Sequence, residues 1–94
     1  MNNLNINNNV NGMVYRNQMI GILIKSIDGK VQFPFAAHIT DVFADIEKIL
    51  YKEYPELLSQ NTYFTVRGKT IKRFMTIQDN NIKNYDIILL NIIE

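Results

Sequence analysis

The sequence predicts an α+β fold, in which a small β-sheet packs against one amphipathic helix. Three observations lead to this prediction. Apolar residues alternate with period two early in the chain, recur with helical spacing after that, and end in a continuous apolar run. The chain has 94 residues, of which 47% are hydrophobic, so one domain with one core is expected.

Residues 1–17 differ in composition from the rest of the chain. Eight of them are Asn, and the few apolar residues among them follow no period. Such a segment buries too little apolar surface to offset the entropy of ordering it. We therefore expect a flexible Asn-rich tail at 1–17 and a folded domain at 18–94. The alternative is a short segment that folds on a partner.

Two strands joined by a tight turn are expected at the start of the domain. The alternation runs through residues 19–25 and again through residues 31–35, and Asp28-Gly29 between them is a strong hairpin signal. Because Pro34 cannot donate a backbone hydrogen bond, the second strand should lie at an edge of the sheet. The inward positions of the two strands are Ile20, Ile22, Ile24, Val31, Phe33 and Phe35.

A helix of about four turns is expected next, because the apolar period changes to that of an α-helix. Thr40 is a suitable N-cap, and Pro55 ends the helix because the residue before a proline disfavours helical backbone. The apolar stripe consists of Val42, Phe43, Ile46, Ile49, Leu50 and Tyr54. The opposite face carries Asp45, Glu47, Lys48 and Lys52, which we interpret as solvated charges.

The residue pattern in the second half of the chain predicts three further strands and one short turn of helix. A strand from Thr62 turns at Gly68 into a short return strand. The Thr76-x-x-Asp79 pattern is that of a capping box, and Asn81 tolerates the left-handed backbone that ends such a turn. The final apolar run should lie at the centre of the sheet beside the first strand. The expected core positions are Phe64, Val66, Ile71, Ile77, Ile82, Ile88 and Leu90.

The spacing of turn and apolar residues in this half is specific. The positions that carry it are Gly68, Lys69, Ile71, Thr76, Ile77, Asp79, Asn81, Ile82, Ile88, Leu90 and Ile92. With the first hairpin, IKSIDGK, this frame resembles ubiquitin and the β-grasp family over about residues 19–93. The resemblance implies a ubiquitin-like β-grasp: a mixed sheet of about four or five strands on one helix, in the order ββαβ(β)β.

The end of the sequence departs from the family's pattern. Ubiquitin-type modifiers end in Gly-Gly, because a narrow enzyme channel grips an extended backbone there, whereas this sequence ends LLNIIE. As written, the chain is not expected to be conjugated. The resemblance implies no catalytic residue, because a modifier is a substrate of other enzymes. Two alternatives stay open: a modifier whose Gly-Gly lies after Glu94, and a ubiquitin-like regulatory domain of a larger protein.

The recognition surface of the family is also altered. Three apolar positions of that surface correspond to Ile27, Thr65 and Asn91, and two of these are polar. A polar group that loses water without a partner costs about 1–3 kcal/mol, so ordinary ubiquitin receptors should bind poorly. Ile87 and Leu89 add apolar area that indicates a different protein partner, unless the chain ends cover them. The candidate partner-binding residues are Ile27, Tyr63, Thr65, Gly68, Lys69, Leu89 and Asn91.

The sequence shows no set of residues typical of an enzyme. It has no Cys and one His, His38, and its carboxylates lie mostly along the predicted helix. Ten basic and nine acidic residues give a net charge of +1 without a basic run, which argues against nucleic-acid binding. No apolar run approaches the ~18 residues of a membrane span, and no secretory signal precedes the domain.

The sequence therefore predicts a non-conjugated ubiquitin-like interaction module, an adaptor or docking domain that binds a protein partner through the outer face of its sheet. We expect no catalytic activity, metal, cofactor or small-molecule substrate. We expect no nucleic-acid or membrane partner either, and a cytoplasmic or nuclear location.

Overall fold

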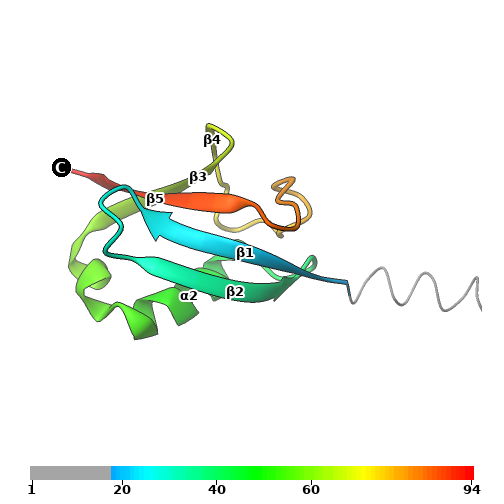
Figure 1. Cartoon of the computed structure of the whole chain (residues 1–94), viewed down its shortest axis with the longest axis horizontal. Helices are drawn as coiled ribbons and strands as arrows, with labels where there is room; N and C mark the ends of the chain where they lie inside the picture. Colours follow the sequence, from blue (N-terminus) through cyan, green and yellow to red (C-terminus); the bar gives the residue numbers. More distant parts are fainter. Residues whose placement is uncertain (1–17) are drawn as a thin grey trace, which may run out of the picture.

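The computed structural model describes residues 18–94, and the tail expected at residues 1–17 lies outside them. The described chain begins with the strands β1 Met19–Ser26 and β2 Gln32–His38, which are followed by the helix α2 Phe43–Glu53 and the 3-10 helix η1 Pro55–Ser59. Three strands complete it: β3 Asn61–Val66, β4 Lys69–Thr70 and β5 Ile87–Ile93 (Figure 1). Between residues 18 and 94, neither helix has the length and apolar character needed to cross a membrane.

The five strands of the described chain form one mixed sheet in the order β2-β1-β5-β3-β4. β1 and β5 pair in parallel at its centre, and the other neighbours are antiparallel. Figure 1 shows α2 running along one side of this sheet. The α+β prediction and the expected pairing of the first and last strands are confirmed. β2 is an edge strand, as Pro34 predicted.

The core lies between α2 and the face of the sheet that we call the inner face. Alternate residues of β1, β3 and β5 are buried there, as the period of two predicts. The rings of Phe43 and Phe64 meet edge to face with 5.0 Å between their centroids. The buried apolar residues are Ile20, Ile22, Ile24, Val31, Ala37, Ile39, Phe43, Ile46, Leu50, Leu57, Phe64, Val66, Ile71, Ile77, Ile82, Ile88 and Leu90. Every core position expected in the second half of the chain is confirmed.

The helix begins later than expected. Its first residue is Phe43, and no side chain caps it, so the prediction of Thr40 as N-cap is wrong. Backbone carbonyls from a distant loop take the place of a cap, because the Phe43 amide donates to Met75 O at 3.0 Å and the Ala44 amide to Arg73 O at 2.7 Å. The C-terminal end is as predicted, since α2 stops at Glu53 just before Pro55.

Two residues of α2 lie in environments opposite to those expected. Ile49, assigned to the apolar stripe, is 43% exposed, whereas Glu47, assigned to the solvated face, is buried. Arg73 from the loop after β4 compensates its charge, with Nη2 2.9 Å from Glu47 Oε2. A buried carboxylate is tolerated only when it is paired and hydrogen-bonded, and this loop supplies the partner.

The segment between β4 and β5 is built on the expected turn. Thr76 Oγ1 accepts a hydrogen bond from the Asp79 amide at 3.0 Å, and Asn81 has a positive φ of 56°. The capping bond to Thr76 and the left-handed role of Asn81 are therefore confirmed, but the segment is a hydrogen-bonded turn and not the expected turn of helix. The turn holds Ile77 and Ile82 in the core.

Candidate protein-binding surface

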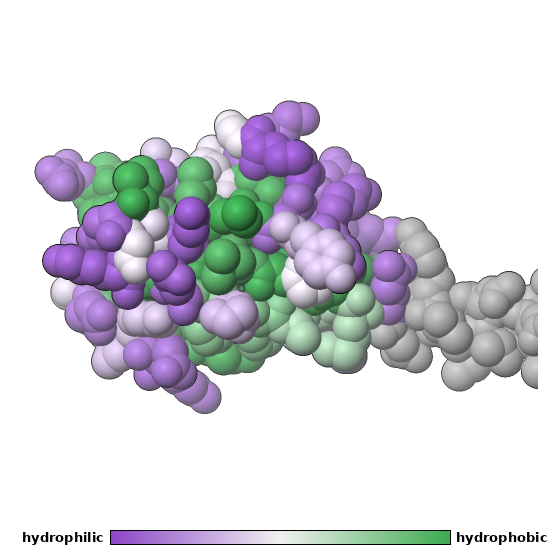
Figure 2. All heavy atoms as spheres, viewed as in Figure 1, coloured by the Kyte–Doolittle hydropathy of each residue, from purple (hydrophilic) through white to green (hydrophobic). Residues whose placement is uncertain are grey.

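The face of the sheet opposite α2, the outer face, brings apolar side chains from three neighbouring strands together. The register places Leu23 of β1 beside both Pro34 of β2 and Ile87 of β5. Leu89 lies two residues further along β5, between Lys25 and Thr65. Figure 2 shows apolar surface gathered over the middle of the molecule, with polar residues around it.

Four of the candidate residues from the sequence are neighbours on this face. Tyr63 pairs with Asn91, and Thr65 pairs with Leu89. The amide of Asn91 donates to Thr65 Oγ1 at 3.4 Å and to Leu89 O at 3.2 Å. The two polar residues therefore satisfy each other in part, which makes this region less receptive to an apolar partner than three aliphatic side chains would be.

The other three candidate residues lie at the margins of the face. Ile27 is 79% exposed in the first hairpin, where it shares a hollow of about 270 Å³ with Asn91. Gly68 has a φ of 80° in the turn after β3. Lys69 pairs with the buried Val66, whereas its neighbour Thr70 pairs with Thr65 and so shares the outer face.

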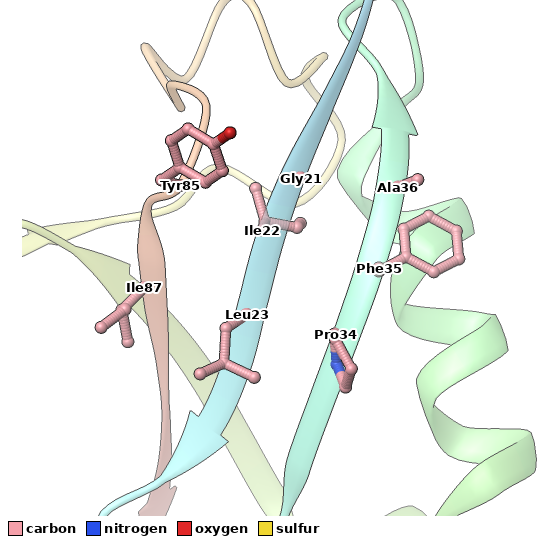
Figure 3. A pocket seen from close by; sticks show the side chains of 8 residues that line it. All are labelled: Gly21, Ile22, Leu23, Pro34, Phe35, Ala36, Tyr85 and Ile87. Atoms are coloured by element: carbon pink, nitrogen blue, oxygen red, sulfur yellow. The ribbon is translucent and has the colours of Figure 1, made fainter.

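A larger hollow on the same face is lined by residues that, apart from Ile87, the sequence did not assign to a binding surface. It measures about 530 Å³ and lies over β2, β1 and the start of β5 (Figure 3). Gly21 lacks a side chain that would fill it, and a Cβ there would meet only Asn84 Oδ1, at 3.8 Å. Figure 3 shows Tyr85 at one end, beside Gly21. We call the residues of the outer face around it the apolar hollow: Gly21, Leu23, Pro34, Ala36, Tyr85 and Ile87.

Tyr85 is held in place by its backbone while its side chain remains 86% exposed. Its φ is 69°, and its amide donates to Gly21 O at 2.7 Å. The Gly21 amide in turn donates to Asn84 Oδ1 at 2.8 Å. The only sequence signal for this arrangement was a Gly inside an alternating strand, which often marks a close approach of another chain segment.

The next residue, Asp86, anchors the base of the same turn. Its Oδ2 accepts hydrogen bonds from the Lys83 amide at 2.7 Å and from Arg67 Nη1. Burial acts to raise the pKa of Asp86, but the Lys83 amide and the Arg67 guanidinium outweigh it and lower the pKa on balance. The segment beside the apolar hollow is thus bonded to the turn after β3 as well as to β1.

The β2 edge offers few free backbone groups for a partner strand. At one end, the Tyr54 hydroxyl bonds both the amide and the carbonyl of Gln32. In the middle, Pro34 has no amide hydrogen. At the other end, the His38 amide donates to Asp41 Oδ2 at 2.9 Å. Binding by strand addition is therefore disfavoured at this edge.

The opposite edge is covered as well. Ile71 donates its amide to Phe64 O at 2.8 Å, and Arg73 Nη2 donates to Thr62 O at 2.9 Å. Because these bonds use several of the edge groups, the outer face is the more accessible surface of the sheet for a partner. Among residues 18–94, no three His, Cys, Asp or Glu side chains are grouped as a metal site would require.

Comparison with known proteins identifies the fold. No protein-family model matches the chain, and no curated protein matches its sequence. Among solved structures, a protein designed de novo on the basis of ubiquitin matches with a TM-score of 0.66 at 14% sequence identity, over 79% of this chain and 88% of that one. Together with the sheet order and the crossing helix, this likeness shows that the chain has the ubiquitin-like β-grasp fold.

Proposed function

We propose that this chain is a protein-interaction module rather than an enzyme, and that it binds a protein partner through the outer face of its sheet. The observation that carries the proposal is the apolar hollow, which lies on the one face that α2 leaves uncovered.

The hollow has the features of an anchor site. Leu23 and Ile87 supply aliphatic surface from adjacent strands, and Ile87 is 48% exposed. Tyr85 adds an exposed aromatic side chain on a backbone that is already hydrogen-bonded, so the backbone need not be ordered on binding. A tyrosine has only two side-chain torsions to fix when a partner covers it. Interfaces draw most of their affinity from a few such residues around a pocket.

The centre of the proposed surface differs from the one expected from the sequence. Thr65 and Asn91 hydrogen-bond to each other, which favours a rim role for them and for Leu89. The proposed centre lies across β1 and β5, at Leu23, Ile87 and Tyr85. Tyr63, Ile27 and the turn at Gly68 and Lys69 would then contact only a large partner.

The proposal can be tested by panning a displayed library of random short peptides against the whole chain. Binders are expected to carry apolar anchors, and the substitution Leu23→Glu should weaken them at least about 30-fold, the loss typical of an interface hot spot. In a spectrum of the labelled protein, the amide signals of Gly21 and Ile87 should shift on binding. Circular dichroism and a thermal melt check that Leu23→Glu folds.

The matched control is Lys48→Glu, which adds the same carboxylate to α2 on the other side of the sheet. Binders that respond to Leu23→Glu but not to Lys48→Glu would support the outer face. If no binder from the library is weakened by Leu23→Glu, the outer face is not the binding surface.

A further inference from the structure

A second surface lies along α2, away from the outer face. Two hollows there share Lys48 and Tyr51. One, of about 220 Å³, extends to Ala44 and Phe74, and the other, of about 300 Å³, extends to Lys52 and Leu58. We call these six residues the helix-side groove. Because Lys48 and Tyr51 line both hollows, the two hollows adjoin along α2.

Large apolar side chains stand at both ends of the groove. Phe74, in the loop after β4, is 81% exposed, and Leu58, in η1, is 70% exposed. Each belongs to a different hollow, with Tyr51 between them. Neither side chain contributes to the core, so their apolar area is available to a partner.

The floor of the groove is fixed by a hydrogen-bonded network. The Tyr51 hydroxyl donates to the buried Glu47 carboxylate and lies 2.5 Å from Thr62 Oγ1. Burial, and then the Glu47 carboxylate, raise the pKa of Tyr51. Arg73 bonds both Glu47 and Thr62 O, and its guanidinium lies 5.9 Å from the centre of the Phe64 ring. A floor that is already ordered loses little freedom on binding.

The charge of the groove comes from its rim. Arg73 neutralises Glu47 in the floor, which leaves Lys48 and Lys52, one helical turn apart. Within the described residues, Lys52 has no carboxylate at ion-pair distance, and Lys48 has only Asp45, at 3.9 Å with both side chains largely exposed. Such an exposed pair contributes little, so both ammonium groups can bind another carboxylate.

We propose that the helix-side groove binds a short acidic linear segment of a partner protein. Its apolar side chains would contact Phe74 and Leu58, and two carboxylates about 6 Å apart would face Lys48 and Lys52, the separation of neighbouring side chains on one helix face. Charge complementarity selects this occupant, since the groove offers cations and apolar surface but no unpaired anion in its floor. This site is separate from the outer face and does not depend on it.

The test pans a displayed random-peptide library against the whole chain, with counter-selection on a Lys48→Glu/Lys52→Glu variant. Surviving peptides should be enriched in Asp and Glu beside Phe, Leu or Trp. Their affinity should fall about tenfold in Lys48→Met, which keeps the apolar stem but removes the charge, and about tenfold in Phe74→Ser. It should also weaken as salt is raised. All three positions are exposed, so the variants are expected to fold, and circular dichroism verifies this.

Leu23→Glu on the outer face is the matched control and should change these affinities less than about twofold. The inference fails if no peptide survives counter-selection, if the survivors lack acidic residues, or if they bind Lys48→Met as tightly as the wild type. It also fails if vesicles of anionic phospholipid or a single-stranded oligonucleotide bind with the same dependence on Lys48 and Phe74. None of these results bears on binders that respond to Leu23→Glu alone.

Discussion

The inner and outer faces of the sheet differ in how far their side chains are constrained. On β1 the inner residues Ile20, Ile22 and Ile24 are all buried, whereas Leu23 between them is only partly covered. The inner-face residues belong to one buried apolar cluster with residues of α2, whereas on the outer face Gly21 leaves a hollow. The difference indicates that the inner face determines stability and the outer face is free to serve binding. The following measurements test this difference between the two faces.

The largest decrease in the free energy of unfolding is expected from Ile24→Ala on the inner face. Ile24 is fully buried, and truncation of such a residue leaves a cavity that costs about 2–5 kcal/mol in the free energy of unfolding. The adjacent substitution Leu23→Ala, on the outer face of the same strand, should cost about 1 kcal/mol or less. Urea unfolding of both variants measures the two values. Equal losses would show that the outer face is as structural as the inner one.

Arg73→Ala should lower the free energy of unfolding by a smaller amount, because it leaves the buried Glu47 carboxylate without its cation. The Arg73 side chain is 37% exposed, so we discount the full cost of breaking a buried pair to about 1–3 kcal/mol. Lys72→Ala, at the exposed neighbouring position, should change stability by less than about 0.5 kcal/mol. Thermal and urea unfolding provide the comparison.

The same pair allows a double-mutant cycle. If Arg73→Ala lowers stability because the charge of Glu47 is left unpaired, adding Glu47→Gln to Arg73→Ala should restore part of that stability. A double variant less stable than the sum of the two single losses would contradict this explanation.

Replacing a glycine by alanine should lower the free energy of unfolding by about 1 kcal/mol at Gly68 and hardly at all at Gly21. Gly68 has a φ of 80°, so Gly68→Ala forces a side chain into the left-handed region and should cost about 1 kcal/mol. Gly21 has no such backbone requirement, and a Cβ there finds ordinary contact distances. Gly21→Ala should keep the stability while it partly fills the apolar hollow and weakens outer-face binders. A clear loss of stability in Gly21→Ala would mean that the hollow is needed for folding.

The smallest expected effect is a change in acid stability at Asp86. Its pKa is lowered in the folded state, so the folded protein binds that proton more weakly than the unfolded chain does. The resulting stabilisation is present above the ordinary pKa of Asp and is lost as the pH falls through the folded-state pKa. Between about pH 5 and pH 2, the stability of Asp86→Asn should therefore decline less than that of the wild type. Parallel decline of the two curves would contradict the role assigned to the carboxylate.

The sequence alone was sufficient for most of the inner face. Alternation in the strands identified Ile24, Phe64 and Ile88 as core residues, and Pro34 identified the edge strand. These predictions hold because a period of two places a side chain on one face whatever the tertiary contacts are. The turn at Thr76 was predictable for a similar reason, since its cap is local in the chain.

The features that could not be predicted depend on segments distant in the chain. Glu47 is buried because Arg73 reaches it, and the first helical amides bond carbonyls of the same distant loop instead of Thr40. The spacing of apolar residues along a helix carries no information about a bonding partner that comes from a distant loop. The Tyr85 amide reaches Gly21 O across the paired strands β1 and β5, so apart from Ile87 and one glycine in a strand the apolar hollow had no sequence signal.

The parallel pairing of β1 with β5 also has a consequence for synthesis. A chain that leaves the ribosome from its N-terminus exposes the first hairpin, with its edge at β1 unsatisfied, until the segment from Ile87 to Leu90 has emerged. Pairings between strands so far apart in the chain are slow to form, because loop closure precedes any gain from contact. The hairpin therefore has to remain unaggregated while the residues between β2 and β5 are synthesised. During that time the missing backbone donor at Pro34 disfavours pairing at its other edge.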